Sequence, residues 1–375
     1  MKIGITCYPT YGGSGVVATE LGKALAKRGH QVHFISYALP SRLHSGFDTN
    51  IFYHEVEMSS YPLFEFPLYT PALASKMLEV AKFEKLDILH VHYAIPHAIS
   101  AFLAKQMMNG SGANVRTVTT LHGTDITLIG LEPSFLSVMK FSIEQSDAVT
   151  AVSRFLKEKT STNYGIDKEI EVIPNFVDIE VFRRMPDSAF RKRVAPNGEK
   201  VVVHTSNFRT VKRVPDVIHV FKKILEKMEA KLILVGDGPD RSNCELLCRE
   251  LGIFQDVKFL GKQEDLVEIL SAADLFLMPS QSESFGLSAL EAMACEVPVI
   301  SSSVGGLPEL VVHGETGFIA EIGDVERMAK YAIDLLTNDT KHAMFAKAGR
   351  ERAVQTFNTD CVVDQYEKAY ERLLR

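Results

Sequence analysis

The sequence predicts an α/β protein made of two doubly wound domains, each with a parallel sheet covered by helices. The chain has 375 residues, which exceeds what one hydrophobic core usually supports. Short apolar runs typical of strands alternate with segments of helical periodicity along most of the chain. The alternation stops once and restarts, so two halves with the same pattern follow each other. Such alternation favours parallel sheets that are buried on both faces.

The first half supplies the strands and helices of one domain. We expect strands at 2–7, 32–35, 51–56, 88–91, 115–120, 148–152 and 171–173. We expect helices at 15–28, 72–83, 96–108, 134–145 and 153–163. Two loops, 37–50 and 57–67, are long and rich in proline, serine and aromatic residues, which is typical of functional or mobile loops.

The pattern pauses near residues 174–178, and 178–198 is charged and irregular. We therefore expect one domain at 1–173 and a second at 174–358. In the second domain we expect strands at 201–205, 231–235, 257–260, 274–278, 297–301 and near 317–319. We expect helices there at 215–228, 241–251, 265–272 and around residue 291, and helices throughout the residues after 319.

The amino-acid composition indicates which binding partners and which cellular compartment to expect. The chain is 46% hydrophobic and 23% charged, as in ordinary soluble proteins, and its net charge of −6 gives no reason to expect nucleic acid or a membrane surface. No apolar stretch approaches the roughly 20 residues that span a bilayer. Five scattered cysteines suggest free thiols in a reducing compartment. We expect a cytoplasmic protein.

The most informative stretch runs from Pro279 to Cys295 and joins an expected strand to an expected helix. Glu283 and Glu291 bracket a glycine, Gly286, whose backbone can approach a ligand closely. The helix that begins there has free N–H groups and a partial positive charge at its start. This combination predicts a pocket for a ligand that carries both hydroxyl groups and phosphate.

A glycine-rich loop, Gly12-Gly13-Ser14-Gly15, enters the first helix and can cradle phosphate with its amides. It also matches a loose Gly-x-Gly-x-x-Ala pattern, so a nicotinamide dinucleotide has to be considered. That signature needs glycines directly after the strand and a carboxylate at the end of the next strand. Several residues intervene after Cys7, and 32–37 has no carboxylate, so the pattern disfavours this cofactor.

Polar residues also follow the strands that end near residues 91 and 120. His122 and Tyr93 stand at carboxyl ends of strands, where ligands bind in such sheets. Zinc could in principle bind His90, His92 and His97, but no cysteine partner or helical histidine spacing supports it, so we expect no metal.

In the second domain, Asn207, Arg209, Lys212 and Arg213 follow the first strand. Without a metal, a diphosphate leaving group needs lysine or arginine to neutralise its charge. The turns 236–239 and 261–264 could place backbone against a nucleobase.

Together these residues resemble family 4 of the retaining glycosyltransferases, which have the GT-B fold of two Rossmann-like domains facing across a cleft. The resemblance covers nearly the whole chain and depends most on Glu283 and Glu291, with seven residues between them. It implies that Thr359–Arg375 crosses back to the first domain as a helix. One departure is Asn207, which stands where many members have an arginine that pairs with the lysine at the diphosphate.

The resemblance also implies roles for individual residues. Catalysis is expected of His122, Lys212 and Glu283. Glu291 is expected to hold the nucleotide ribose and Glu283 to lie by the donor sugar. The full set expected to contact the donor is Gly13, Ser14, Gly15, Asn207, Arg209, Lys212, Gln263, Ser284, Phe285, Gly286, Leu287 and Glu291.

Within the family, segments 90–97, 122–127 and 206–213 look closest to members that transfer N-acetylglucosamine from UDP-GlcNAc to the hydroxyl of L-malate, the first step of bacillithiol biosynthesis. The cationic and hydrogen-bonding side chains that could bind this dicarboxylate are those of Tyr93, Thr120, Arg154, Arg209 and Asn207. We expect retention of configuration through attack on the same face of the sugar.

Three alternatives stay open at this point. The chain could be a GT-B glycosyltransferase with another small acceptor, a UDP-GlcNAc epimerase, or a non-catalytic protein that binds a nucleotide sugar. The apolar stretch 61–71 could form an interface between copies of the chain.

Overall fold

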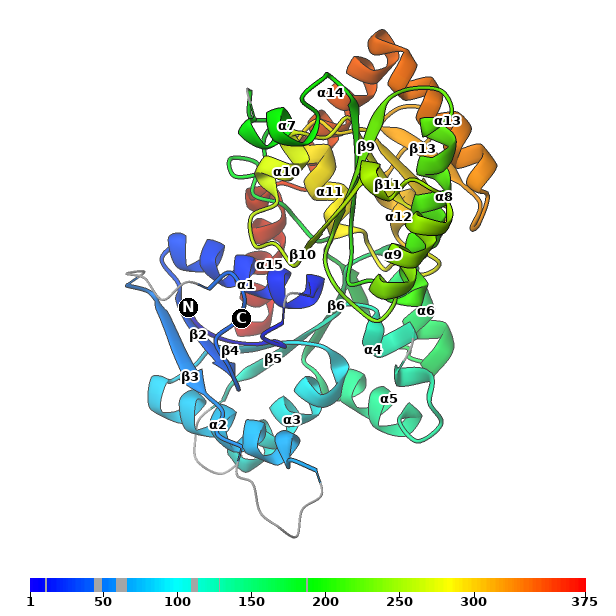
Figure 1. The fold of residues 1–375 in the computed structure, drawn as a ribbon. Helices are drawn as coiled ribbons and strands as arrows, with labels where there is room; N and C mark the ends of the chain where they lie inside the picture. The colour runs from blue at the N-terminus through cyan, green and yellow to red at the C-terminus, as the bar shows by residue number, and fades with distance from the viewer. Residues whose placement is uncertain (11, 44–48, 59–65, 109–113, 128, 187) are drawn as a thin grey trace. The chain divides into compact units, whose positions relative to one another are not determined.

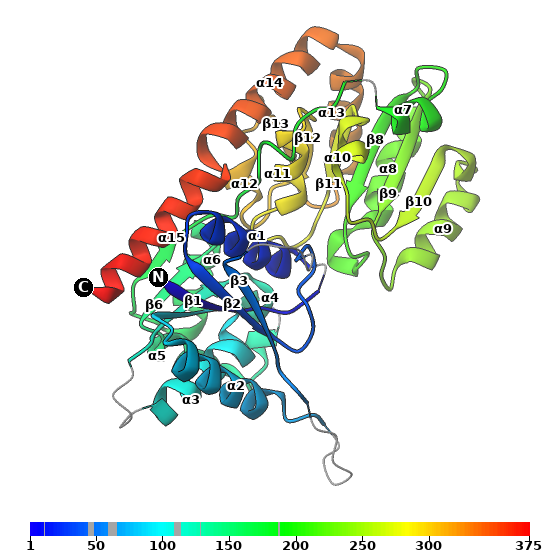
Figure 2. The same cartoon turned by 90° about the vertical axis from the view of Figure 1, so that its left-hand side faces the viewer.

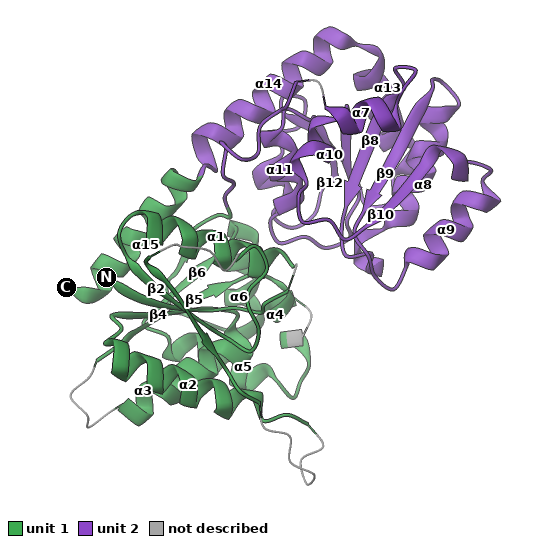
Figure 3. Cartoon of the chain, turned by 60° about the vertical axis from the view of Figure 1, so that its left-hand side comes forward, with its two compact units in different colours: residues 1–175, 359–375 green, residues 176–358 purple. Residues whose placement is uncertain are grey.

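The computed structural model divides the chain into two compact units (Figures 1 and 3). Unit 1 comprises residues 1–175 and 359–375, and unit 2 comprises residues 176–358. Unit 2 is thus inserted between the bulk of unit 1 and its last helix. The residues that the structure describes are 1–10, 12–43, 49–58, 66–108, 114–127, 129–186 and 188–375.

Unit 1 contains a seven-stranded parallel sheet with the order β3-β2-β1-β4-β5-β6-β7. The strands are β1 (Lys2–Thr6), β2 (Gln31–Ser36), β3 (Ile51–Glu55), β4 (Ile88–His92), β5 (Arg116–Leu121), β6 (Ala148–Ala151) and β7 (Ile170–Val172). In the register of the central strands, His90 of β4 pairs with Ile5 of β1 and with Val118 of β5. All carboxyl ends of a parallel sheet meet at one edge, so the loops after β1, β4 and β5 lie next to one another.

Helices cover both faces of this sheet. Figure 2 shows α1 and α15 on one side of the sheet and α2 and α3 on the other. The helices of unit 1 are α1 (Gly13–Lys27), α2 (Tyr69–Glu84), α3 (Ile99–Met108), α4 (Thr124–Thr127), α5 (Leu136–Gln145), α6 (Arg154–Tyr164) and α15 (Thr359–Leu374). Leu89 and Val91 of β4 are fully buried on the side of α2 and α3, so the alternate residues His90 and His92 face the α1 and α15 side.

Helix α15 is bound to unit 1 by charge as well as by burial. Arg28, at the end of α1, forms ion pairs with Asp360, Asp364 and Glu367 of α15 at 2.8, 2.5 and 2.6 Å. His30 adds a contact to Glu367 at 2.7 Å. The inward face of α15 buries aliphatic and tyrosine side chains against the sheet. The last helix of the chain therefore completes the core of the first unit.

Unit 2 repeats the architecture with a six-stranded parallel sheet of order β10-β9-β8-β11-β12-β13. The strands are β8 (Lys200–Thr205), β9 (Ala230–Val235), β10 (Val257–Gly261), β11 (Leu275–Met278), β12 (Val299–Ser302) and β13 (Gly317–Ala320). The helices are α7 (Ala189–Val194), α8 (Val214–Leu225), α9 (Arg241–Glu250), α10 (Val267–Ser271), α11 (Leu287–Ala294), α12 (Leu307–Leu310), α13 (Val325–Thr337) and α14 (Asp339–Thr356).

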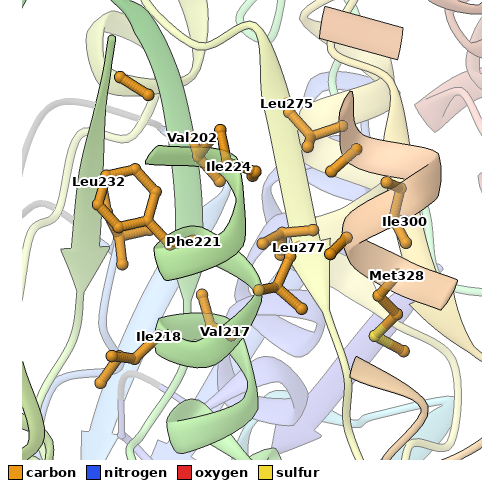
Figure 4. Close-up of a cluster of buried hydrophobic side chains, with 14 of the residues drawn as sticks. Val202, Val217, Ile218, Phe221, Ile224, Leu232, Leu275, Leu277, Ile300 and Met328 are labelled. Atoms are coloured by element: carbon orange, nitrogen blue, oxygen red, sulfur yellow. The ribbon is translucent and has the colours of Figure 1, made fainter. Parts of the chain in front are cut away.

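One hydrophobic cluster of unit 2 lies between its sheet and helices α8, α9 and α13. Val217, Phe221 and Ile224 recur at helical spacing on one face of α8 and pack on the strands (Figure 4). Each such side chain contributes about 1.5 to 3 kcal/mol when it leaves water. This packing makes the sheet a rigid base for the loops at its carboxyl edge.

The predicted α/β class with two parallel sheets is confirmed, and each expected strand is present with its ends shifted by at most two residues. The stretch 178–198 is the exception to the expected helices, because it contains α7 where we expected irregular structure. Ser188 begins this helix by accepting a hydrogen bond from the amide of Arg191 at 3.2 Å. The units change over at residues 175 and 176, two residues beyond the expected boundary.

Several smaller expectations can also be compared with the structure. All five cysteines are free, and only Cys361 is exposed. Within the described ranges, no helix combines the length and the hydrophobicity needed to cross a bilayer. Residues 44–48 and 59–65 of the two long loops lie outside the described residues. The latter segment includes most of the apolar part of the stretch 61–71.

Replacing Arg28 with alanine should loosen α15. Three carboxylates would then face one another without a cation, so the free energy of unfolding should fall by about 1 to 2 kcal/mol. Hydrogen exchange of the α15 amides in the full chain would measure the effect as faster exchange in α15. Arg372→Ala is a matched control, because Arg372 forms a single exposed pair with Glu171. Equal exchange rates in both variants would contradict the anchoring role of Arg28.

Candidate functional site

The carboxyl ends of β4 and β5 bring two predicted residues of unit 1 together. Tyr93 follows β4 and His122 follows β5, and the centroids of their rings lie 5.7 Å apart. The amide of Tyr93 donates to the carbonyl of Thr120 at 2.9 Å, so strand pairing continues into the loop. Both rings are partly exposed and can contact a ligand.

The glycine-rich loop reaches the same edge of the sheet. The hydroxyl of Ser14 donates to that of Tyr93 at 3.1 Å. A Cβ on Gly15 would lie 2.5 Å from the carbonyl oxygen of Tyr8, so only glycine allows the loop to pass so close to α1. Gly13 is exposed and is the first residue of α1, where amides have no acceptor within the helix. The loop can therefore offer N–H groups to an anion.

A stack of three imidazoles extends inward from this edge. His92 lies between His90 and His122, with ring centroids 4.5 and 5.0 Å away. Nδ1 of His92 is 2.8 Å from Nε2 of His122, and Nδ1 of His90 is 2.7 Å from the hydroxyl of Tyr370 on α15. Sequence reasoning considered His90 and His92 only as zinc ligands. Their spacing of two residues in a strand was the signal that they share a face.

Burial keeps these histidines neutral. It lowers the pKa of His90 and His122 to about 3 and that of His97 to about 4, and it also lowers the pKa of His92 well below its ordinary value. Nδ1 of His97 donates to the carbonyl of His92 at 2.5 Å, because a carbonyl can only accept. At neutral pH each ring thus carries one proton.

Asp125 is a residue of this edge that sequence reasoning missed. Its carboxylate accepts hydrogen bonds from the amides of Ala94 and Gly123, both at 3.0 Å, and so ties the loop after β4 to the loop after β5. Burial raises its pKa to about 6, against the effect of these amides. The signal for it was an acidic residue in the first turn of a short helix, α4, shortly after the end of β5.

Thr120, which we expected to contact an acceptor, lies at the carboxyl end of β5. Its side chain is fully buried, and its hydroxyl lies 2.7 Å from both Nε2 of His90 and the hydroxyl of Thr150. Thr120 thus belongs to a polar network inside unit 1 that α15 covers. Arg154, by contrast, is exposed at the start of α6, after the carboxyl end of β6.

In unit 2, the two residues expected to act at the diphosphate and the sugar lie in direct contact. Nζ of Lys212 is 2.5 Å from Oε2 of Glu283, and both side chains are largely buried, at 20% and 16% exposure. The amide of Gln281 donates to the carbonyl of Val211 at 2.7 Å, which joins the two loops that carry the pair. A partly buried cation therefore stands beside a carboxylate at the sheet edge.

The loop of Glu283 is held by close backbone packing. A Cβ on Gly305 would lie 1.7 Å from the carbonyl oxygen of Glu283, and the amide of Gly306 donates to that oxygen at 3.0 Å. Gly286 has a φ of +100°, and a Cβ there would lie 2.6 Å from Leu307. Each of these positions excludes a side chain, so the loop has one well-defined path.

Helix α11 begins directly after this loop. Leu287 is its first residue, Phe285 packs in an edge-on contact with Phe357, and Ser284 is partly exposed. Glu291 is 4% exposed and lies about one turn into the helix. The first amides of α11 are free to bind an anion, with a carboxylate in the following turn.

Close backbone packing against a glycine also fixes the path of the loop after β8. A Cβ on Gly238 would lie 1.9 Å from the carbonyl oxygen of Asn207. Asn207 and Arg209 are exposed, and Arg209 forms no ion pair within the described part of the chain. Gln263 is also exposed, and its side-chain amide donates to the carbonyl of Leu260 at 2.8 Å. The exposed groups here are one guanidinium and two amides.

The predicted residues thus fall into two groups, one at the carboxyl edge of each sheet. The unit 1 group offers a phenol, a neutral imidazole and helix amides, and the unit 2 group offers a lysine, two carboxylates and helix amides. Across the described residues, no group of three or more His, Cys, Asp or Glu could hold a metal ion.

Comparison with known proteins gives two family matches that together span most of the chain. The model described as "Glycosyltransferase Family 4" matches residues 11–181, and that described as "Glycosyl transferases group 1" matches residues 187–352. A curated N-acetyl-alpha-D-glucosaminyl L-malate synthase of Bacillus anthracis is 50% identical over 376 residues, covering 100% of this chain and 98% of that protein.

A more distant relative is a GDP-mannose-dependent monoacylated alpha-(1-6)-phosphatidylinositol monomannoside mannosyltransferase of Corynebacterium glutamicum. It is 31% identical over 303 residues and covers 76% of both chains.

Solved structures share the fold at low identity. Alr3699/HepE of Anabaena in complex with UDP and glucose has a TM-score of 0.83 at 22% identity, with 99% of each chain covered. Sucrose-phosphate synthase of Thermosynechococcus elongatus has a TM-score of 0.80 at 23% identity, covering 100% of this chain and 99% of that one. The two Rossmann-like units therefore have the GT-B fold, and the whole-length identity places the chain in family 4 of the glycosyltransferases.

Proposed function

We propose that the protein is a retaining glycosyltransferase that moves N-acetylglucosamine from UDP-GlcNAc to the hydroxyl of L-malate. The observation that carries this proposal is the 50% identity, over the whole chain, with the malate synthase of Bacillus anthracis. The Lys212–Glu283 pair and the two sets of helix amides support the chemistry, because transfer from a nucleotide sugar needs a charge partner for the diphosphate.

In this proposal unit 2 binds the donor. Glu291 accepts hydrogen bonds from the ribose hydroxyls, and the amides of Phe285, Gly286 and Leu287 meet the sugar and a phosphate at the start of α11. Gln263 and the turn that carries it lie against the base. In unit 1, the amides of residues 13–15 at the start of α1 form an anion site that we also assign to the donor.

Lys212 stabilises the leaving group. As the bond between the anomeric carbon and the phosphate oxygen breaks, negative charge develops on the diphosphate, and the ammonium of Lys212 compensates it. Arg209 supplies a second cation in place of the arginine that many family members have at the position of Asn207. Its guanidinium is exposed and free of ion pairs within the described residues.

The acceptor attacks on the face that the diphosphate leaves. The malate hydroxyl oxygen bonds to the anomeric carbon, and its proton passes to the departing phosphate oxygen. Glu283, already paired with Lys212, orients the lysine and the sugar rather than forming a covalent bond. His122 contacts the sugar. No metal is needed in this scheme, because lysine, arginine and helix amides carry the charge.

Malate recognition is proposed for Tyr93, Arg154, Asn207 and Arg209. The phenol and the amide donate hydrogen bonds, and the guanidinium groups can bind carboxylates in a bidentate manner. Thr120 belongs to the same expected set, and its buried hydroxyl bonds to His90 and Thr150.

UDP release from UDP-GlcNAc, measured with malate, inositol phosphate and simple sugars, tests the proposed function. We expect release that depends on malate and a product that retains the configuration of the donor. UDP release with another acceptor but not with malate would contradict the malate assignment and still agree with a glycosyltransferase. Formation of a new sugar nucleotide without any acceptor would instead indicate an epimerase. No UDP release with any acceptor would indicate a non-catalytic protein that binds a nucleotide sugar.

Lys212→Ala should lower kcat by about a hundredfold or more, because the departing diphosphate loses its cation. The dissociation constant for UDP should change far less than kcat. Steady-state kinetics and calorimetry measure the two quantities. Lys223→Ala is the matched control, since Lys223 of α8 pairs with Glu326 of α13, whose side chain is exposed. An unchanged kcat in Lys212→Ala would remove the leaving-group role.

Glu291→Ala and Glu283→Ala should affect different kinetic parameters. Loss of the ribose contact should raise the KM for UDP-GlcNAc about tenfold or more, because a charged hydrogen bond contributes about 1.5 to 3 kcal/mol. Loss of Glu283 should mainly lower kcat. The Gln variants keep the shape of each side chain and separate loss of charge from loss of packing. If both alanine variants changed kcat and KM equally, this division of roles would be wrong.

A further inference from the structure

His92 occupies a position between the interior of unit 1 and the candidate site. Its ring is fully buried and lies between those of His90 and His122. Among the residues that the structure describes, the only polar contact of its ring is the 2.8 Å approach of Nδ1 to Nε2 of His122. One of these two nitrogens must carry the proton that they share, because two lone pairs repel each other.

The second ring nitrogen of His92, Nε2, indicates which of the two nitrogens in this contact carries the proton. Nε2 of His92 is buried and has no hydrogen-bond partner among the described residues. The ring is neutral, since burial and the neighbouring imidazoles lower its pKa well below the ordinary value, so exactly one of its nitrogens is protonated. His122, in contrast, is partly exposed, and its second nitrogen can be satisfied by water or by a ligand.

Two proton arrangements are compatible with the 2.8 Å contact. If His122 donates, His92 carries its proton on Nε2, and an N–H group is buried without an acceptor. If His92 donates from Nδ1, only a lone pair is buried without a partner. Native proteins bury orphan N–H groups more rarely than incompletely paired acceptors, so the second arrangement is favoured.

We propose that His92 is a positioning residue that donates its Nδ1–H to Nε2 of His122 and so holds His122 in the tautomer protonated on Nδ1. This inference rests on the proposed role of His122 at the donor sugar. The group that His122 then presents to a substrate is an N–H donor. It can bind a sugar hydroxyl or a phosphate oxygen, but it cannot remove a proton from the acceptor.

The consequence agrees with the proposed proton balance. If His122 has no free lone pair, it cannot accept the proton of the malate hydroxyl, which agrees with transfer of that proton to the departing phosphate oxygen. His90 fixes the position of the His92 ring by stacking on it. The two nitrogens of His90 form hydrogen bonds with the hydroxyls of Tyr370 and Thr120, both at 2.7 Å. The tautomer of His122 is thereby linked to residues deep in the sheet.

Long-range 1H–15N correlation spectra of the full chain labelled on histidine would read the tautomers directly. We expect His122 and His92 both to be protonated on Nδ1, with signals assigned by comparison with single variants. A spectrum in which His122 is protonated on Nε2 would overturn the proposal. This measurement uses the ligand-free protein, so it does not depend on which acceptor the enzyme uses.

Kinetics provide the second readout. In His92→Asn the side-chain amide can take the place of Nδ1 and donate to His122, so kcat should stay within about threefold of the parent value. His92→Leu removes the donor, and kcat should fall by about tenfold or more while the dissociation constant for UDP changes little. Equal losses in the two variants, or no loss in His92→Leu, would contradict the donor role.

His33→Leu is a matched control on the same sheet. His33 is 1% exposed, its Nδ1 lies 2.9 Å from Nε2 of His54, and its own Nε2 is buried without a partner in the described structure. This variant should alter stability without lowering kcat. If the acceptor panel showed no malate dependence while the spectra gave the expected tautomers, the proposed acceptor would be lost and the role of His92 would stand.

Discussion

In a parallel sheet the carboxyl ends of all strands lie at one edge, and in both units of this protein the candidate site residues follow those ends. His122 and Tyr93 follow neighbouring strands of the first sheet, and Lys212 and Glu283 follow neighbouring strands of the second. No long loop is needed to bring these residues together, because β4 pairs with β5 and β8 pairs with β11. A helix also begins at the carboxyl edge of each sheet, α1 in unit 1 and α11 in unit 2, so each unit has helix amides near its candidate site residues.

The loops at these edges owe their shape to backbone packing rather than to side chains. Glycines stand wherever one loop passes over another, as at Gly15 against Tyr8 and Gly305 against Glu283. A single methyl group at either position would overlap with a carbonyl oxygen. The positions of the candidate site residues on these loops therefore depend in part on residues that have no side chain of their own.

Much of this arrangement could be predicted from the sequence because it is local. Apolar runs mark strands, and the spacing of Glu283 and Glu291 around Gly286 marks a strand, a turn and a helix within a short stretch. The features that the sequence does not reveal depend on contacts between distant parts of the chain. Thr120 stands at the end of a strand, as an acceptor ligand would, yet it is buried in a network that α15 covers. Nothing near residue 120 in the sequence indicates that cover.

The contact between His92 and His122 is of the same kind, since the two residues are 30 positions apart and meet only because their strands pair. Helix α7 was missed for a different reason. It is six residues long and rich in charge, so its apolar periodicity is too short to detect.

The insertion of unit 2 into unit 1 has a consequence for the order in which the protein can be completed on the ribosome. Tyr370, which binds His90, is separated from it by 280 positions. All of unit 2 is synthesised before the helix that covers the histidines of unit 1. A nascent chain can thus finish its second domain while part of one face of its first sheet, later covered by α15, is still exposed. The histidine network acquires its last hydroxyl only when α15 docks.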